Sequence, residues 1–224
     1  DNDDKTNYNG KTYLSADPIM GDEYTASMET DGASICLDDS RFINTSSGKR
    51  TNATGEYCDI ALNNNGYPVI AYYDVNSTLR LAFASDSFPK GEGAASKWTV
   101  QDVMNVNDSN YNRPMACYIA CEFDESGYLH IVFQNVKNQL IYLKSKSNGV
   151  SASGKYEFED SVVLADYGMR MDMHIKGNTP YISYISSVNS ADGLCLAFYD
   201  STLDLDCDGN AEGGWEAMAA PLSR

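Results

Sequence analysis

The chain has 224 residues, of which 42% are hydrophobic, and this is enough for a substantial core in one large domain or two small ones. It carries 32 acidic against 16 basic side chains, a formal net charge of −16, which disfavours nucleic acid and anionic membranes as partners. No apolar run approaches the roughly 20 residues that a membrane span needs, so we expect no span. A chain that starts "DNDDK" and ends "PLSR" is also compatible with a piece processed from a longer protein.

The first 56 residues form the weakest candidate unit of the chain. Phe42 in "SRFINTS" lies 56 residues before Trp98, which predicts the fourth strand of a first repeat there. A rival alignment matches "YTASMETDGASICLDD" with "YCDIALNNNGYPVIAYYD" and predicts a hairpin of first and second strands instead. Both alignments stay open at this point.

Three longer segments then repeat one pattern. They begin "YCDIALNNNGYPVIAYYD", "CYIACEFDESGYLHIVFQN" and "MRMDMHIKGNTPYISYIS". In each segment a short apolar strand, a polar turn and two further strands precede a longer polar loop. An aromatic residue then opens a fourth strand: Trp98, Tyr156 or Trp215. Apolar and polar residues alternate along these strands, and no helical stripe is present, so the predicted fold class is all-β.

Four-stranded antiparallel units repeated every 40 to 60 residues or so are typical of β-propeller blades. We predict one propeller domain over 1–224, with approximate blades at 1–56, 57–113, 114–167 and 168–224. The domain is either a closed four-bladed ring or a fragment of a larger propeller. An open stack would expose edge strands, and its partner would then be the remaining blades of a longer chain or an oligomer.

The segment "IALNNNGYPVIAYYD…LRLAFAS…KWTVQDV" resembles a repeat of secreted and surface bacterial proteins, whose consensus runs roughly "LALDSNGNPHISYYD…LKYA…W…V". The resemblance covers about residues 55–222. It implies propeller blades and an extracytoplasmic location, whether secreted, periplasmic or on the cell surface. It implies less about function, because propellers host enzymes, lectins and scaffolds alike.

The acidic stretch "DLDCDGNAEGGW" near the end of the chain has the spacing of a calcium loop. Its oxygen donors stand at positions one, three, five, seven and nine: Asp204, Asp206, Asp208, Asn210 and Glu212. Position twelve is Trp215, so the stretch is not a complete EF-hand loop. It resembles the D-x-D-x-D-G-x-x-[DE] loops of integrin-type propeller blades, although it joins a third strand to a fourth. We predict a Ca²⁺ site here, with a solvated acidic turn as the alternative.

The six cysteines are widely spaced and include no C-x-x-C pair, which argues against a zinc ribbon or a thioredoxin-type site. Cys117 and Cys121 lie four residues apart in a predicted strand, about 13 Å along it, too far to bond each other. Disulfides elsewhere, such as one between Cys195 and Cys207, and buried free thiols both fit the pattern.

Candidates for catalysis are few. His130 and His174 are the only histidines, both fall in or near predicted strands, and we interpret them as structural. A sialidase-like site would need clustered arginines, but Arg80, Arg113 and Arg170 come from different units, and no sialidase Asp-box occurs. We interpret most strand tyrosines as packing residues.

The predicted function is a non-enzymatic binding or scaffold protein, either a surface adhesin or an assembly subunit with a protein or glycan partner. The alternative is a glycan-active propeller, either a lectin or a sialidase-like glycosidase.

Overall fold

The computed structural model describes residues 5–8, 11–14, 41–44, 49–55, 57–74, 76–87, 97–106, 117–188, 191–203 and 213–219. Within these ranges the regular elements are sixteen β-strands, with no helix among them. Accordingly, none of the described segments is a helix of the length and apolarity that crossing a membrane requires. The all-β prediction is confirmed.

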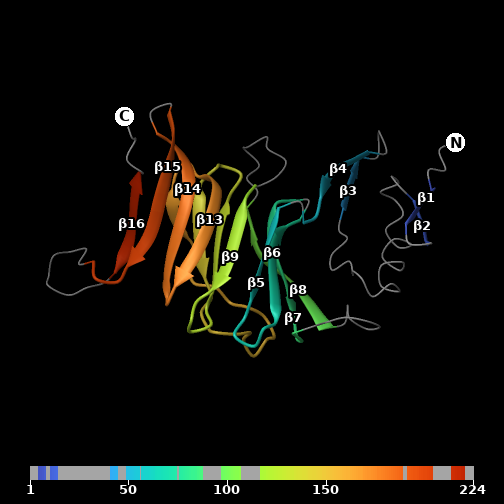
Figure 1. Cartoon of the computed structure of the whole chain (residues 1–224), viewed down its shortest axis with the longest axis horizontal. Coiled ribbons are helices and arrows are strands. Elements are labelled where there is room, and N and C mark those ends of the chain that lie inside the picture. The colour runs from blue at the N-terminus through green and yellow to red at the C-terminus, as the bar shows by residue number, and fades with distance from the viewer. Residues whose placement is uncertain are drawn as a thin grey trace.

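Three four-stranded antiparallel sheets contain most of the described residues, and in each sheet the strands neighbour one another in chain order (Figure 1). Sheet 1 contains β5 (Cys58–Leu62), β6 (Pro68–Tyr73), β7 (Thr78–Ala84) and β8 (Trp98–Asn105). Sheet 2 contains β9 (Ile119–Phe123), β10 (Leu129–Gln134), β11 (Leu140–Lys144) and β12 (Val162–Ala165). Sheet 3 contains β13 (Met169–Lys176), β14 (Thr179–Val188), β15 (Ala191–Asp200) and β16 (Gly214–Ala219). The predicted four-strand repeat is therefore present three times.

Two short hairpins precede these sheets. The first pairs β1 (Lys5–Tyr8) with β2 (Lys11–Leu14), and the second pairs β3 (Arg41–Asn44) with β4 (Lys49–Ala53). Phe42 lies in β3, but 15–40 fall outside the described residues, so neither alignment of the N-terminal unit is tested.

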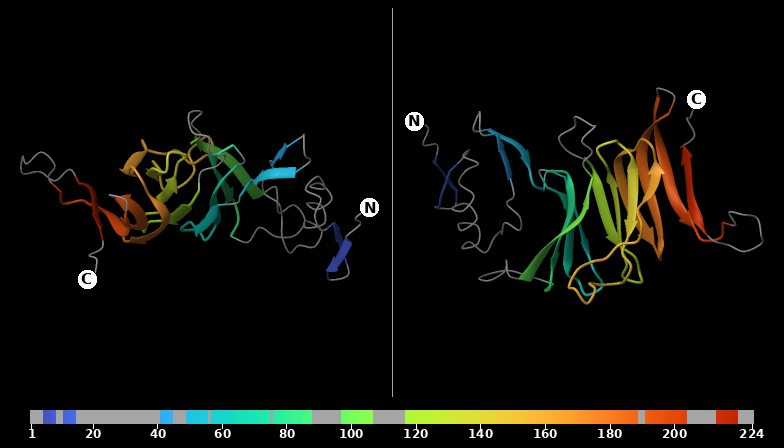
Figure 2. Two further views of the ribbon diagram at one scale, coloured as in Figure 1. Left: turned by 90° about the horizontal axis from the view of Figure 1, so that it is seen from above. Right: turned by 180° about the vertical axis from the view of Figure 1, so that it is seen from behind.

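The three sheets stack side by side in chain order, with sheet 2 in the middle (Figure 2). Their first strands adjoin: β5 contacts β9, and β9 contacts β13. Two hydrophobic clusters fill the spaces between the sheets. Val69 and Ala71 of sheet 1 belong to the same cluster as Ile131 of sheet 2, whereas Val132 clusters with Ile182 of sheet 3. Since fully burying a side chain such as Val or Ile stabilises a fold by about 1.5–3 kcal/mol, these two clusters hold the stack together.

The turns between first and second strands show the repeat in atomic detail. The sequence "NNNGY" of sheet 1 and "DESGY" of sheet 2 make the same four-residue turn. The Asn63 side-chain oxygen accepts a hydrogen bond from the Tyr67 N–H at 3.0 Å, and the Asp124 carboxylate accepts one from the Tyr128 N–H at 2.8 Å. Each turn needs one residue with positive φ, which glycine supplies at little cost: 75° at Gly66 and 87° at Gly127.

The fourth strand of sheet 2 differs from the prediction. It begins at Val162, not at Tyr156. Tyr156 is buried between sheets 1 and 2, where its ring meets the Phe83 ring edge-on with centroids 5.2 Å apart. Its backbone N–H donates to Gln101 Oε1 at 2.9 Å, and its carbonyl accepts from Gln101 Nε2 at 2.6 Å. Gln101 therefore takes the backbone groups that strand pairing would have used. Trp98 does begin β8, as expected, and Trp215 is the second residue of β16.

Candidate functional site

The predicted calcium ligands all lie outside the described residues: Asp204, Asp206, Asp208, Asn210 and Glu212. The two residues that flank this stretch are joined, because the Gly213 N–H donates to the Leu203 carbonyl at 3.0 Å. Both belong to the connection between β15 and β16, as the sequence predicted. In the part of the chain that the structure describes, no group of three or more His, Cys, Asp or Glu side chains is placed to hold a metal ion. The calcium site therefore stays a prediction.

The disulfide prediction is not supported by the cysteines that the structure describes. All four of them are free thiols: Cys58, Cys117, Cys121 and Cys195. Of the two interpretations that the sequence left open for Cys195, a disulfide with Cys207 or a buried free thiol, the structure shows a free thiol, buried in the cluster between sheets 2 and 3. Cys207 itself lies outside the described residues. Burial also raises the pKa of the Cys121 thiol well above its usual value, which keeps this thiol protonated and unreactive.

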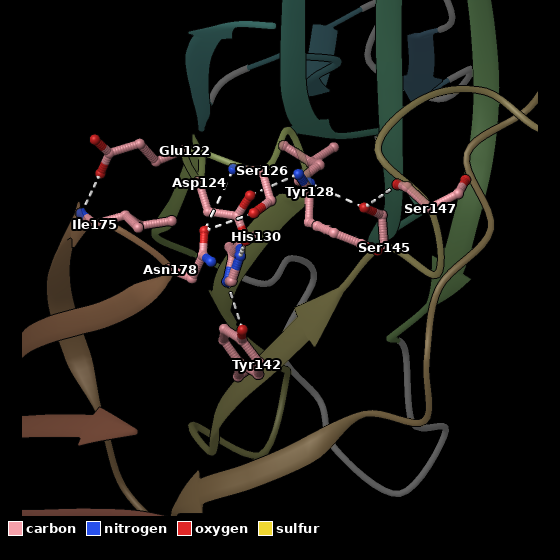
Figure 3. A network of polar contacts seen from close by, with 11 residues as sticks. Glu122, Asp124, Ser126, Tyr128, His130, Tyr142, Ser145, Ser147, Ile175 and Asn178 are labelled. Atoms are coloured by element: carbon pink, nitrogen blue, oxygen red, sulfur yellow. Dashed lines mark hydrogen bonds and ion pairs between the residues drawn. The ribbon is translucent and has the colours of Figure 1, made fainter. Parts of the chain in front are cut away.

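A network of buried polar contacts lies in sheet 2 (Figure 3). His130 of β10 stands between Asp124 and Tyr142: its Nε2 lies 3.1 Å from Asp124 Oδ2, and its Nδ1 is hydrogen-bonded to the Tyr142 hydroxyl. Asp124 is 2%, His130 1% and Tyr142 7% exposed. Strand alternation explains the placement, because His130 shares a face of β10 with Val132 and so points toward sheet 3.

Burial sets the protonation of this network. It lowers the pKa of His130 from its usual 6.5, although the hydrogen bond and the charge of Asp124 act in the opposite direction. Burial likewise raises the pKa of the Tyr142 hydroxyl well above its usual value. The neutral imidazole therefore donates its Nε2–H to Asp124 and accepts the Tyr142 O–H at Nδ1. The Tyr142 ring in turn meets the Trp215 ring edge-on, with centroids 4.6 Å apart.

An aspartate–histidine–tyrosine chain could relay a proton, but a substrate would have to reach it. Each member is more than nine-tenths buried, and Trp215 of sheet 3 covers the tyrosine end. The geometry assigns the network to the structure of the sheet 2–sheet 3 interface, which agrees with the interpretation of His130 as a structural residue. Sequence reasoning missed its two partners, Asp124 and Tyr142.

Two carboxylates join the first strands of successive sheets. Asp59 Oδ2 of β5 accepts a hydrogen bond from the Cys121 N–H of β9 at 2.8 Å. Glu122 Oε2 of β9 accepts one from the Ile175 N–H of β13, also at 2.8 Å (Figure 3). These acids, which sequence alone could not distinguish from a glycosidase pair, are therefore occupied in holding the stack together. The other histidine, His174, is 81% exposed and lies 3.5 Å from Glu122 Oε1.

The arginines that a sialidase-like site would need are not brought together among the described residues. Arg80 lies in sheet 1, where its Nε donates to Asp102 Oδ1 at 2.6 Å and its Nη2 lies 3.4 Å from Asp74 Oδ2. Arg170 lies on β13 of sheet 3, with sheet 2 between the two, and Arg113 falls outside the described residues. Tyr73 and Tyr184 are buried in the two clusters, as the packing interpretation predicted.

One face of sheet 3 carries exposed apolar side chains. Alternating residues of β14, β15 and β16 point away from sheet 2 and form this surface, which we call the outer face of sheet 3: Tyr181, Ser183, Ile185, Leu194, Leu196, Phe198, Glu216 and Met218. Leu194 is 58%, Met218 50% and Tyr181 39% exposed. The Tyr181 and Phe198 rings are stacked, with centroids 6.0 Å apart and planes 20° from parallel. Sequence reasoning did not single out Tyr181, although its alternation with the buried Ile182 marked it as outward-facing.

No protein-family model matches the chain, and no curated protein matches it.

Proposed function

We propose that the chain is a non-enzymatic, extracytoplasmic binding or scaffold protein built on β-propeller blades, acting as a surface adhesin or an assembly subunit. The observation that carries this proposal is the serial stack of sheets together with the outer face of sheet 3, on which apolar and aromatic side chains are exposed. Such a face is typical of a protein that assembles with, or adheres to, another molecule.

The blade arrangement is supported by the order of the strands. In every sheet the first strand in sequence is an edge strand, and the first strands of successive sheets adjoin. Propeller blades have this order around a central axis. A four-bladed ring and a segment of a larger propeller both fit it.

The non-enzymatic part of the proposal is supported by how the candidate catalytic groups are used. His130 is 1% exposed and held on both ring nitrogens. Asp59 and Glu122 accept backbone hydrogen bonds from the neighbouring sheet. These groups stabilise the stack, and a calcium ion bound by Asp204, Asp206 and Asp208 would stiffen the connection between β15 and β16 in the same way.

Two measurements test the proposal. In its native cells the protein should be cleaved by protease added outside intact cells, and retention behind the inner membrane would contradict the extracytoplasmic assignment. A panel of chromogenic glycosides should give no turnover with the purified protein. Turnover that is lost on changing a carboxylate of the chain would make the protein an enzyme.

A second candidate, glycan binding, is favoured by the Tyr181–Phe198 pair, because flat aromatic surfaces stack against sugar rings. Asp172 and Glu216 on the same face could accept hydrogen bonds from sugar hydroxyl groups. A glycan array tests this candidate: a sugar ligand should be lost in Tyr181→Ala and retained in Tyr67→Ala, a control at the turn of sheet 1. An array without a ligand would remove the candidate.

A further inference from the structure

Sheet 2 has an outer border along which only one side of the last strand is paired. The strand order of the sheet is β12–β11–β10–β9, so β12 neighbours β11 alone. The connection before β12 continues this border: the Lys146 N–H donates to the Glu157 carbonyl at 2.8 Å, and the Glu159 N–H donates to the Lys144 carbonyl at 2.9 Å. Residues 157–165 therefore run beside β11 and its extension, and we call them the outer edge of sheet 2.

The open side of β12 has backbone groups that can pair with another strand. Within the described part of the chain, no backbone hydrogen bond joins Val162, Val163 or Leu164 to an element other than β11. In an antiparallel strand, every second residue directs its N–H and C=O groups away from a given neighbour. The groups that point away from β11 are therefore available to an added strand.

The side chains of β12 are apolar and accessible. Val162 is 38% and Val163 50% exposed. Because successive side chains of a strand point to opposite faces of the sheet, two exposed valines in a row mean that both faces are accessible at this point. Leu164 and Ala165, by contrast, are partly buried against the cluster between sheets 2 and 3. The strand thus offers apolar contact on both faces beside its unpaired backbone groups.

The fourth strands of the other two sheets carry charges that protect their edges. Asp102 lies within β8 and Glu216 within β16. A charged side chain on an edge strand disfavours the addition of another strand. No residue of β12 is charged. Its charges lie on either side of the strand instead, and all of them are exposed: Glu157, Glu159 and Asp160 before it and Asp166 after it.

We propose that the outer edge of sheet 2 binds an extended segment of a partner protein by strand addition, and that this segment carries β-branched residues flanked by lysine or arginine. The proposal rests on the binding or scaffold function above and names the chemistry of its partner. Main-chain hydrogen bonds to β12 would supply affinity, and Val162 and Val163 would contact apolar side chains of the segment. The basic flanks would lie opposite Glu159, Asp160 and Asp166.

Charge decides which strand this edge accepts. A second copy of the chain has a formal net charge of −16, and pairing edge to edge would bring the acidic flanks of two copies together. Repulsion of this kind protects natural edge strands against self-association. A segment with basic flanks is attracted by the same carboxylates, so one set of charges both repels the wrong partner and selects the right one. Binding should accordingly weaken between about 0.05 M and about 0.5 M NaCl, as the Debye length falls.

Fluorescence anisotropy with labelled peptides tests the proposal. The probe is Lys-Lys-Thr-Val-Thr-Val-Thr-Lys-Lys, which should bind the wild-type protein with a Kd below about 1 mM at low salt. Three matched peptides should each bind at least about tenfold more weakly. The first has Glu in place of Lys, the second has Gly-Ser-Gly-Ser-Gly between the lysines, and the third has the probe sequence with N-methylated Val and Thr amides. They remove in turn the charge, the strand propensity and the main-chain donors.

Variants of the chain test whether the probe binds at this edge. Val163→Lys places a like charge in the middle of the edge and should weaken probe binding by about tenfold or more. Leu194→Lys makes the same change of charge at an exposed residue of sheet 3, and this variant should bind the probe like the wild type. Glu159→Gln and Asp160→Asn should each weaken binding by up to about fivefold. These two conservative variants keep the test open should Val163→Lys not fold.

Hydrogen exchange with the probe bound locates the contact. The amides of β12 should exchange more slowly, and those of β14 should be unchanged. No binding of the probe, equal binding of the Gly-Ser or the N-methylated peptide, or binding that survives the variants of the edge would overturn the strand-addition proposal. None of these results would affect the location and turnover measurements, so this proposal and the binding or scaffold proposal fail separately.

Discussion

Replacing His130 with leucine tests the assignment of the buried network to structural stability. The change leaves two groups without their partner, Asp124 Oδ2 and the Tyr142 hydroxyl, both in the sheet 2–sheet 3 interface. A buried polar group that loses its partner costs about 1–3 kcal/mol, so His130→Leu should lower the free energy of unfolding by about 2–6 kcal/mol. That is a large share of the roughly 5–15 kcal/mol that stabilises a folded domain.

The chain offers a matched control, because His174 is its only other histidine. His174 is 81% exposed, and an exposed contact such as its 3.5 Å approach to Glu122 is worth less than about 1 kcal/mol. His174→Leu should therefore change the free energy of unfolding by less than about 0.5 kcal/mol. Urea denaturation followed by tryptophan fluorescence measures both variants. Equal effects of the two changes would refute the structural assignment of His130.

The same pair of variants gives a pH signature. The pKa of His130 is lowered in the folded protein, from its usual 6.5, so the unfolded chain binds a proton at a pH where the folded chain does not. Stability contributed by His130 is therefore complete above pH 6.5 and is lost as pH falls below it, toward the lowered folded pKa. Between about pH 7.5 and about pH 5.5, His174→Leu should lose more stability than His130→Leu. Parallel pH profiles would contradict the burial of a neutral imidazole.

Three further predictions concern other parts of the molecule. Tyr73→Phe removes the hydroxyl that donates a hydrogen bond to the Gln134 carbonyl at 2.8 Å, from sheet 1 to sheet 2. In urea denaturation this change should lower the free energy of unfolding by about 0.5–1.5 kcal/mol. The control Tyr181→Phe, on the outer face of sheet 3, should leave the free energy of unfolding unchanged. Gly168→Ala should destabilise the fold by about 1–3 kcal/mol, because a Cβ at this position would lie 2.7 Å from the Leu140 Cβ. Gly149→Ala is the control, because a Cβ there meets open space, and it should leave the stability unchanged. Thermal unfolding measures both variants. Isothermal titration should show calcium binding that disappears in Asp206→Ala and in Asp208→Ala, and binding that survives both changes would place the metal elsewhere.

The sequence was sufficient to predict the strands because period-two alternation and turn chemistry are local properties. Trp98 began β8 as expected, and "NNNG" and "DESG" marked turns that the structure contains. Tyr156 was wrongly predicted to begin the fourth strand of sheet 2. Its hydrogen-bond partner, Gln101, lies 55 residues earlier in another sheet, and no local sequence pattern predicts that contact.

The buried network could be predicted only in part. Within the repeat, His130 stands where sheet 1 has Val69, so a polar residue at a core position was visible as a departure from the pattern. The third member, Tyr142, lies next to His130 because the β10–β11 register pairs His130 with Lys144 and Val132 with Tyr142. This register could not be predicted from the sequence, because it depends on how the two strands pair in the folded sheet. The outer face of sheet 3 was readable from the alternation along β14, but the exposure of its side chains depends on how whole sheets pack.

The carboxylates that join the sheets have a second consequence. The first strand of each sheet has one side without a neighbouring strand, and a free strand edge is where foreign strands add and aggregation starts. Asp59 and Glu122 already occupy the N–H groups of Cys121 and Ile175 on such edges. An intruding strand would have to displace a charged acceptor from each of them. The same two contacts that order the stack thus also protect β9 and β13 against mispairing during folding and refolding, when neighbouring chains are close together.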